Sequence, residues 1–320
     1  MRIGVLTALW QDLPFEQVLD KAAAAGLAAV EIGAGGYTGQ HHCPVDDLLE
    51  SASKRKAWLA AITSRGLMLS SLSVHGNPLH PDKAAARRFD SEYRKAVRLA
   101  ALLETPVVNV FSGLPGGAPG DATPNWVTCP WPPDFLDILK YQWNEVAVPY
   151  WKDAAKVLVE HGVKAAFEMH PGMLVYNVET MLRLREAVGP AMGCNFDPSH
   201  LFWNGVDPLA AIRKLGDAIY HVHGKDCYVD LLNVSVNGCN DSKPYGEIPR
   251  RAWTFRTIGY GHDAKVWKDI VSALRLVGYD YVISIEHEDP LMSNDEGLAK
   301  AVAMLKEAVM SESPGKMFWA

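Results

Sequence analysis

Residues 165–200 read AAFEMHPGMLVYNVETMLRLREAVGPAMGCNFDPSH and contain one complete unit of the fold. An apolar run at Ala165–His170 precedes a helical pattern at Val178–Val188 and a second apolar run at Met192–Pro198. Short apolar runs that alternate with segments of helical period are typical of parallel βαβ units. Both runs end in ionisable residues, so the segment predicts a parallel sheet with polar groups at one edge.

The same alternation continues in both directions along the chain and gives eight strand–helix units. The other strands are expected at Arg2–Thr7, Ala28–Gly33, Met68–His75, Val107–Phe111, Ala218–Gly224 and Tyr281–Glu288. The other helices are expected at Phe15–Ala25, Arg55–Arg65, Ala84–Leu103, Tyr150–His161, Pro208–Leu215, Lys265–Val277 and Glu296–Val309. Several helices end in a glycine before the next strand, namely Gly26, Gly66, Gly162 and Gly278, as expected where a residue with positive φ closes the last turn.

Eight such units favour a closed (β/α)₈ TIM barrel over an open doubly wound sheet. The glycine cluster at 33–36 lacks the G-x-G-x-x-G spacing of a dinucleotide-binding loop. With 320 residues, of which 48% are hydrophobic, the chain fits one domain over residues 1–320. Two long connections, 113–135 and 227–263, follow strands and are expected to rise over the carboxyl-terminal face as walls or a lid of a site. A role in oligomer contacts is the alternative.

Composition narrows the class of protein. Lysine and arginine total 31 against 37 aspartate and glutamate, and no basic run marks a surface for nucleic acid. The five cysteines are scattered without a C-x-x-C pair, which favours a reducing compartment over a disulfide framework or a zinc knuckle. The start, MRIGVLTALW, does not resemble an export signal, and no apolar stretch reaches membrane-spanning length. We therefore expect a cytoplasmic protein without a membrane or nucleic-acid partner, and we leave assembly into a homo-oligomer open.

Ionisable residues follow four successive strands in the second half of the chain. They lie in AAFEMHPG (Glu168, His170), GCNFDPSH (Asp197, His200), YHVHGKD (His221, His223, Asp226) and ISIEHED (Glu286, His287, Glu288). A buried carboxylate without a partner costs several kcal/mol, so such a set needs a shared cation or a dense hydrogen-bond network. Two Glu, one Asp and one His suit Mn²⁺, Mg²⁺ or Co²⁺, and Zn²⁺ is a further option.

The segments FEMHP, NFDPSH, HVHGKD and SIEHED, with SVHGNPLHP and FRTIGYG, resemble the xylose-isomerase-like TIM barrel superfamily. The resemblance covers nearly the whole chain and is greatest to the bacterial sugar phosphate isomerase/epimerase group. Keto-sugar 3-epimerases and inosose dehydratases are other members. It implies one divalent metal ion, Mn²⁺ first among the candidates, on Glu168, Asp197, His223 and Glu286.

The resemblance also implies substrate contacts. His200 matches a histidine that touches substrate in relatives, and Arg256 is similar to a substrate-binding arginine. His75 and His170 are candidate donors to sugar hydroxyls, His170 also as a catalytic acid. Aromatic walls are expected from Trp10 and Phe111 and, in later loops, from Trp203 and Trp253.

The function expected from this set is metal-dependent isomerisation or epimerisation of a small sugar substrate. A divalent metal lowers the cost of the enediolate formed when the carbon next to a carbonyl loses its proton. Glu168 and Glu286 are the candidate base and acid. The substrate is expected to be a keto-sugar or a 3-keto-glycoside. The alternative is a lyase or dehydratase that eliminates a β-substituent from the same intermediate, on a keto-sugar, a 3-keto-glycoside or an inosose. A more remote alternative is a non-catalytic barrel that binds a sugar.

Overall fold

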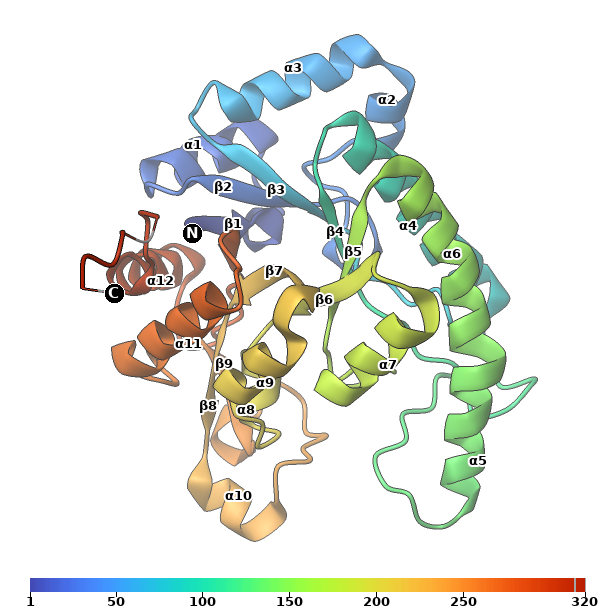
Figure 1. Ribbon diagram of the computed structural model, residues 1–320. Coiled ribbons are helices and arrows are strands. Elements are labelled where there is room, and N and C mark those ends of the chain that lie inside the picture. Colours follow the sequence, from blue (N-terminus) through green and yellow to red (C-terminus); the bar gives the residue numbers. More distant parts are fainter. Residues whose placement is uncertain (314, 320) are drawn as a thin grey trace.

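The computed structural model describes residues 1–313 and 315–319 and contains a closed barrel of eight parallel strands surrounded by helices (Figure 1). Around the barrel the strands follow the order β1-β10-β7-β6-β5-β4-β3-β2. Their bounds are β1 Arg2–Leu6, β2 Ala29–Gly33, β3 Met68–Ser73, β4 Val107–Val110, β5 Lys164–Glu168, β6 Met192–Phe196, β7 Ile219–Gly224 and β10 Val282–Ile285. The predicted TIM barrel is confirmed, and every predicted strand contains an observed one to within about one residue at its start.

The helices cover the outside of the barrel. Those predicted from the sequence are α1 Phe15–Ala24, α3 Ala52–Thr63, α4 Lys83–Leu102, α6 Val148–His161, α7 Val178–Val188, α9 Pro208–Leu215, α11 Ala264–Leu276 and α12 Asn294–Ala308. Additional helices are α2 Val45–Glu50, α5 Asp134–Tyr141, α8 Ser199–Phe202 and α10 Leu231–Asn237. Among the residues described, none of these helices has the length and apolar character needed to cross a membrane.

Local signals in the sequence set the helix ends. The four glycines expected to stop helices all have positive φ: 72° at Gly26, 71° at Gly66, 66° at Gly162 and 87° at Gly278. An L side chain at such a φ is strained, so these positions end the helix and turn the chain toward the next strand. Helix starts are marked as well: at the amino-terminal end of α7, the Asn177 side chain accepts a hydrogen bond from the backbone N–H of Thr180, 2.9 Å away.

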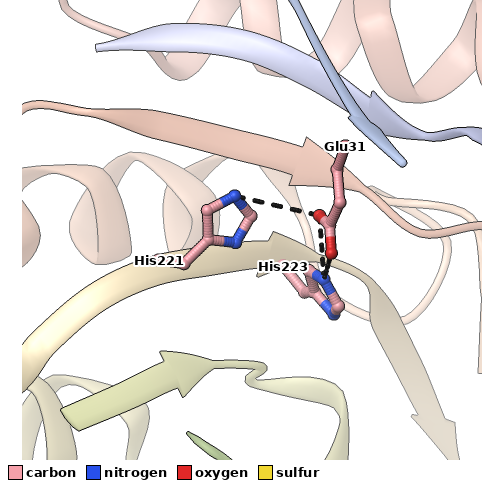
Figure 2. Close-up of side chains that lie close together, drawn as sticks. All are labelled: Glu31, His221 and His223. Carbon is pink, nitrogen blue, oxygen red and sulfur yellow. Dashed lines mark hydrogen bonds and ion pairs between the residues drawn. The ribbon is translucent and has the colours of Figure 1, made fainter. Parts of the chain in front are cut away.

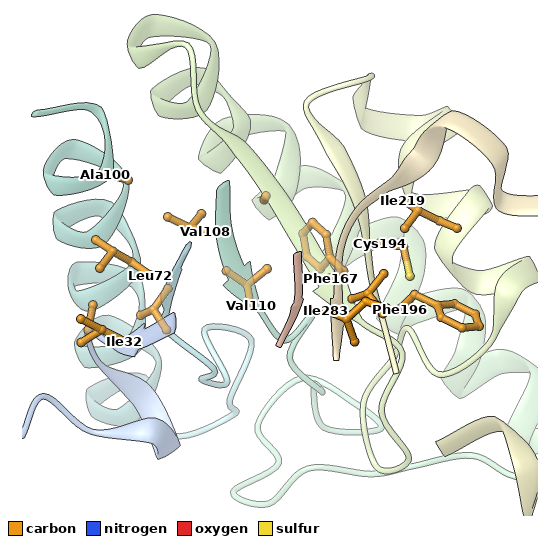
Figure 3. Close-up of a cluster of buried hydrophobic side chains, with 14 of the residues drawn as sticks. Ile32, Leu72, Ala100, Val108, Val110, Phe167, Cys194, Phe196, Ile219 and Ile283 are labelled. Carbon is orange, nitrogen blue, oxygen red and sulfur yellow. The ribbon is translucent and has the colours of Figure 1, made fainter. Parts of the chain in front are cut away.

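Apolar side chains of the strands are buried between the barrel and its helices. Figure 3 shows part of this cluster, with Leu72, Val108 and Phe167 from strands beside Ala100 of α4. These side chains are completely buried, and each large one contributes about 1.5–3 kcal/mol relative to exposure. Because the outward strand faces fill this core, polar side chains of the same strands point into the barrel.

The predicted 227–263 connection is more regular than a loop. It carries two short antiparallel strands, β8 Asp226–Val229 and β9 Trp253–Arg256, with α10 between them. A second apolar cluster holds them to the barrel and consists of Trp203, Cys227, Ala252, Trp253 and Phe255. By contrast, the 113–135 connection has no helix or strand before α5 begins at Asp134. Figure 1 shows both segments extending from the same end of the molecule.

Candidate metal centre and cavity

Four ionisable side chains meet at the carboxyl-terminal end of neighbouring strands. Glu168 ends β5, Asp197 follows β6, His223 lies in β7 and Glu286 follows β10. These strands are consecutive in the barrel, which brings one potential ligand atom from each residue within 4.8 Å of the others. The structure therefore gathers all four residues that the sequence nominated as metal ligands.

The contacts within this quartet leave its inner atoms open to a cation. His223 Nδ1 lies 2.9 Å from Glu286 Oε2 and 3.2 Å from Glu168 Oε2, yet it makes no properly oriented hydrogen bond. Asp197 Oδ2 is also buried and has no aligned hydrogen bond among the described residues, although Lys225 Nζ lies 3.2 Å from it. Its Oδ1 accepts from the backbone N–H of Ser199. Buried polar atoms are nearly always paired. Three carboxylates and an imidazole that face one another in this way fit a divalent metal ion.

The charges of the quartet depend on one another. Burial raises the pKa of Glu168, but the hydrogen bond from His200 and the close approach of His223 and His75 outweigh burial and hold that pKa well below its usual value. Burial lowers the pKa of His223, but the adjacent Glu31 and Glu286 carboxylates raise it well above the ordinary value. Burial also raises the pKa of Glu286, but Lys225 and His223 outweigh burial and lower it to about 2. Glu168 and Glu286 are therefore ionised at the mouth of the barrel.

Glu31, which the sequence analysis did not nominate, fixes the orientation of His223. It is completely buried in β2, and His223 Nε2 donates to its carboxylate, 3.1 Å from each oxygen. Figure 2 shows Glu31 reaching from its strand to both His221 and His223. Asn109 Nδ2 and the Ser73 hydroxyl also donate to Glu31. Since Nε2 donates to Glu31, Nδ1 is the nitrogen that faces the other three ligands, and a metal bound there would displace its proton.

Strand alternation explains why Glu31 points inward. Its neighbours in β2, Val30 and Ile32, are buried in the apolar cluster between barrel and helices, so Glu31 faces the other way, into the barrel. The register shift at this point comes from an extra residue in β3, since Val30 pairs with Leu69 and Glu31 with Ser71. A lone Glu inside the apolar run AAVEIG was the available signal for this residue.

Lys225 is the second residue that sequence reasoning missed. Its side chain is 2% exposed, and Nζ lies 2.8 Å from Glu286 Oε2, 3.2 Å from Asp197 Oδ2 and 3.2 Å from Glu288 Oε2. Burial lowers the pKa of Lys225, but these carboxylates raise it well above the ordinary value. The ammonium group therefore stays charged and balances part of the negative charge of the quartet. Its position directly after H-V-H-G was the signal in the sequence.

A cavity of about 430 Å³ opens above this centre. Such a volume is in the usual range for a small-molecule site, roughly 300–1,000 Å³. The walls carry charged, imidazole and aromatic groups, among them Tyr37, His75, Phe111, Glu168, His170, Lys225 and Glu286. His75 lies in the wall with Nε2 3.1 Å from Glu168 Oε2. Phe111 packs edge-on against His75, so one side of the cavity is apolar.

The hydrogen bonds of His170 differ from the donor role expected for it. His170 Nδ1 lies 2.6 Å from the carbonyl oxygen of Pro171, which can only accept, so Nδ1 carries the proton. Burial, with a smaller contribution from His200, lowers the pKa of His170 to about 3. The ring is therefore neutral at pH 7 with Nε2 as an acceptor. His200 directs Nε2 at Glu168, 3.0 Å away, and its Nδ1 has no hydrogen-bond partner.

Two predicted substrate-binding residues lie away from the cavity. Trp10 follows β1 in a 3₁₀ turn, donates to Asp295 and lines a separate hollow against α1 and α12. Arg256 ends β9, and its Nε lies 3.0 Å from Asp289 Oδ2. Neither lines the cavity above the quartet. The turn after β1 and the β8–β9 ladder direct both side chains elsewhere, so a contact of either residue with substrate stays a prediction.

Comparisons with known proteins match the chain over most of its length. Residues 19–308 fit the family model described as xylose isomerase-like TIM barrel. The chain is 42% identical over 312 residues to the uncharacterized protein YfiH of Bacillus subtilis (strain 168), covering 97% of this chain and 99% of YfiH. It is 33% identical to the inosose dehydratase of Clostridium tetani over 92 residues, covering 26% of this chain and 31% of that enzyme.

Solved structures share the fold at low sequence identity. The probable 3-DHS dehydratase AsbF of Bacillus anthracis has a TM-score of 0.67 at 18% identity, covering 96% of this chain and 99% of AsbF. The IolI protein with a bound zinc atom has a TM-score of 0.65 at 16% identity, over 97% and 98% of the two chains. A D-tagatose 3-epimerase-like protein has a TM-score of 0.64 at 21% identity, over 96% and 97%.

Proposed function

The chain belongs to the xylose isomerase-like TIM barrel family, and we propose that it is a metal-dependent isomerase or epimerase that removes a proton next to a sugar carbonyl. The substrate is a keto-sugar or a 3-keto-glycoside. The observation that carries the proposal is the quartet Glu168, Asp197, His223 and Glu286, which lies at the floor of a cavity of ligand size.

The metal belongs on the four atoms that face one another in the quartet. A divalent ion there would draw electron density from the substrate carbonyl and so ease loss of the neighbouring proton. Mn²⁺ is our first candidate because carboxylate oxygens dominate the set. Zn²⁺ is the second, and the zinc-bound IolI neighbour supports it.

The chain's own carboxylates are placed for proton transfer. Glu168 and Glu286 both line the cavity. The hydrogen bond from His200 keeps Glu168 ionised, and the charge of Lys225 keeps Glu286 ionised. In the proposed cycle one stays ionised and accepts the proton from the substrate carbon, while the other takes up a proton from solvent and delivers it to the opposite face. The first carboxylate then releases its proton to solvent. A positioned group of this kind typically contributes about 10²–10⁴-fold to the rate.

Elimination is a second candidate, and Lys225 favours it. Its ammonium group lies in the cavity wall 2.8 Å from Glu286 Oε2. In a dehydratase, one carboxylate would take the carbon-bound proton and Lys225 would protonate the β-oxygen as it leaves, releasing water and an enone. The local similarity to inosose dehydratases agrees with this alternative. His170 is less suited to donate that proton, because its Nε2 is an acceptor.

The test is a substrate screen with Mn²⁺ in D₂O. We expect 3-keto-glucosides or ketohexoses to exchange the proton next to the carbonyl, as followed by proton NMR, with loss of exchange on chelation. Glu168→Gln and Glu286→Gln should each lower exchange by at least about 10²-fold. The matched control is Glu160→Gln, an exposed residue of α6.

Distinct outcomes separate the alternatives. Appearance of an enone absorbance instead of a new epimer identifies the eliminating enzyme. Sugar binding without any exchange, in the presence of each candidate metal, identifies a non-catalytic barrel. Full activity of either glutamine variant contradicts the two-carboxylate scheme.

A further inference from the structure

The cavity above the quartet continues into two adjoining hollows. One, of about 390 Å³, is lined by Tyr245, Phe255 and Glu288, and the other, of about 400 Å³, by Trp126, Trp203 and Trp253. His170 lines both hollows and also the cavity over the metal centre. Glu288 lines both the cavity over the metal centre and the hollow of about 390 Å³, and Tyr245 lines both hollows. The three spaces therefore adjoin around His170, and each is as large as an ordinary ligand site.

The hollow lined by Trp126, Trp203 and Trp253 has walls of aromatic rings from three separate segments. Trp126 comes from the 113–135 connection, Trp203 follows α8, and Tyr245 and Trp253 come from the 227–263 connection. Trp203 and Trp253 stack with ring centroids 4.8 Å apart and an angle of 8° between the planes. Tyr245 is 58% exposed although its ring stacks on Phe255. Both long connections thus converge on one hollow beside the metal centre.

Hydrogen-bond donors in these walls have no partner within the described residues. Trp203 is 4% exposed, and its Nε1 makes no hydrogen bond. Nε1 of Trp126, which lines the same hollow, is also without a partner. Buried indole N–H groups usually find an acceptor. Trp253 does so, since its Nε1 donates to the carbonyl of Cys239. The missing acceptors are those that a bound molecule with hydroxyl oxygens would supply.

We propose that this hollow, defined by Trp126, Trp203, Tyr245 and Trp253, is a subsite for the second ring of a glycoside, a sugar or other polyhydroxylated ring. The proposal rests on the proposed function: the reacting sugar occupies the cavity over the quartet, and the glycosidic oxygen lies near His170. Aromatic faces pack on the apolar face of such a ring, while indole N–H groups donate to its hydroxyls. A free ketohexose would fill the cavity over the quartet and leave the aromatic hollow empty. It would therefore be the poorer substrate.

Kinetic discrimination tests the substrate class. The probes are the methyl α- and β-glucosides oxidised at C3, and maltose and cellobiose oxidised at C3 of the non-reducing glucose. We expect kcat/KM for proton exchange with the better disaccharide to exceed that of the matching methyl glycoside by at least about tenfold. Equal values for the two sizes, or a preference for the methyl glycoside, would overturn the subsite.

Variants on the aromatic wall locate the effect. Trp126→Ala and Tyr245→Ala should each reduce the disaccharide-to-methyl ratio of kcat/KM by at least about fivefold. Both residues are partly exposed, so their truncation spares the core. Trp131→Ala is the matched control, because Trp131 lies on the same connection as Trp126, is 73% exposed and lines neither hollow. An unchanged ratio in both wall variants contradicts the proposal.

Binding measurements separate this inference from the proposed chemistry. Unoxidised maltose and cellobiose, titrated against tryptophan fluorescence, report on the hollow without any reaction. Tighter binding of a disaccharide than of its methyl glucoside, lost in Trp126→Ala, supports the subsite even if no probe exchanges its proton. Exchange with every probe but no size preference in rate or binding leaves the proposed function intact and removes the subsite.

Discussion

His223 lies between carboxylates on both sides of its ring, and Glu31 is the one that sets its tautomer. Glu31 holds Nε2 at 3.1 Å, and Nδ1 faces Glu168 and Glu286. Partners of this kind orient a metal-binding imidazole and raise its basicity. Glu31→Gln should therefore weaken Mn²⁺ or Zn²⁺ binding by about 10–100-fold, measured by isothermal titration calorimetry.

The control for this experiment separates orientation from loss of charge. Glu31→Asp keeps the charge but shortens the side chain, and Glu160→Gln removes a charge from the surface of α6. We expect the aspartate variant to bind metal with intermediate affinity and the surface variant to match the wild type. Unaltered affinity in Glu31→Gln would mean that His223 is oriented without it.

Lys225 and a bound metal would neutralise the same carboxylates. Removing one partner of a buried ion pair typically costs about 3–5 kcal/mol, because the other charge is left uncompensated. Lys225→Met should therefore lower the Tm of the metal-free protein markedly, and saturating Mn²⁺ should restore much of the loss. Thermal unfolding with and without Mn²⁺ measures both values.

An exposed lysine gives the comparison for that variant. Lys156 pairs with Asp153 at 2.9 Å, but its side chain is 78% exposed. Surface pairs contribute about 0–1 kcal/mol, so Lys156→Met should change Tm little in either condition. Equal losses of Tm in Lys225→Met with and without Mn²⁺ would argue that Lys225 serves packing alone.

The residues of the quartet were predictable because each ends an apolar strand with an ionisable group. Glu31 and Lys225 were not predicted, since one polar residue within or after an apolar run has many structural explanations. That Trp10 and Arg256 lie outside the cavity wall was not foreseen for a related reason. Their side-chain directions depend on a 3₁₀ turn and on the β8–β9 ladder, and neither direction follows from residue type.

Among the elements, the barrel strands and outer helices follow from hydrophobic period and glycine stops. The 227–263 connection did not follow, because β8 and β9 have four residues each. Two such short strands gain their stability from pairing and from the cluster around Trp203 and Trp253. Tertiary contacts of this kind leave little trace in local sequence.

Asp241 stabilises the 227–263 connection through hydrogen bonds, and its titration makes the stability of this connection depend on pH. Its side chain is 1% exposed and accepts from the backbone N–H and Nζ of Lys243 and from the backbone N–H of Ala252. Burial raises the pKa of Asp241, but these hydrogen bonds outweigh burial and lower it to about 2. Because the folded pKa lies below the ordinary aspartate value of 3.8, the stabilisation is complete above pH 3.8 and is lost as pH falls toward 2.

Hydrogen exchange can follow this local stability. After correction for intrinsic rates, amides of 227–263 should exchange faster at pH 3 than at pH 6, while amides of β5 and β6 stay protected. Asp241→Asn should show the faster exchange already at pH 6 and lose the pH dependence, since loss of hydrogen bonds to a charged group costs about 1–3 kcal/mol. The surface variant Asp269→Asn on α11 is the control. Equal protection of the connection at both pH values would contradict the role of Asp241.

At the scale of the whole molecule, the quartet joins strands that are consecutive in the closed barrel. β5, β6, β7 and β10 each supply one residue, so a metal ion bound to all four would link that side of the barrel. A ligand that binds only the folded state adds about 2.7 kcal/mol of stability at 100 times its Kd. For a chain of this size, that gain should raise Tm by about 3–6 °C.

Calorimetry with and without metal tests this coupling independently of any substrate. After chelation and dialysis, Mn²⁺, Co²⁺, Zn²⁺ and Mg²⁺ are added separately to the wild type and to Asp197→Asn. Asp197 is suited to this test because its Oδ2 is buried in the quartet without an aligned hydrogen bond among the described residues, with Lys225 Nζ 3.2 Å away as the cation that a metal would replace. We expect the rise in Tm to be largest for the metal that best supports proton exchange and to be strongly reduced in Asp197→Asn. The exposed variant Glu160→Gln should retain the full rise. A Tm that no metal alters would mean that Lys225 and the histidines already balance the quartet, and the metal-dependent function would then have to be abandoned.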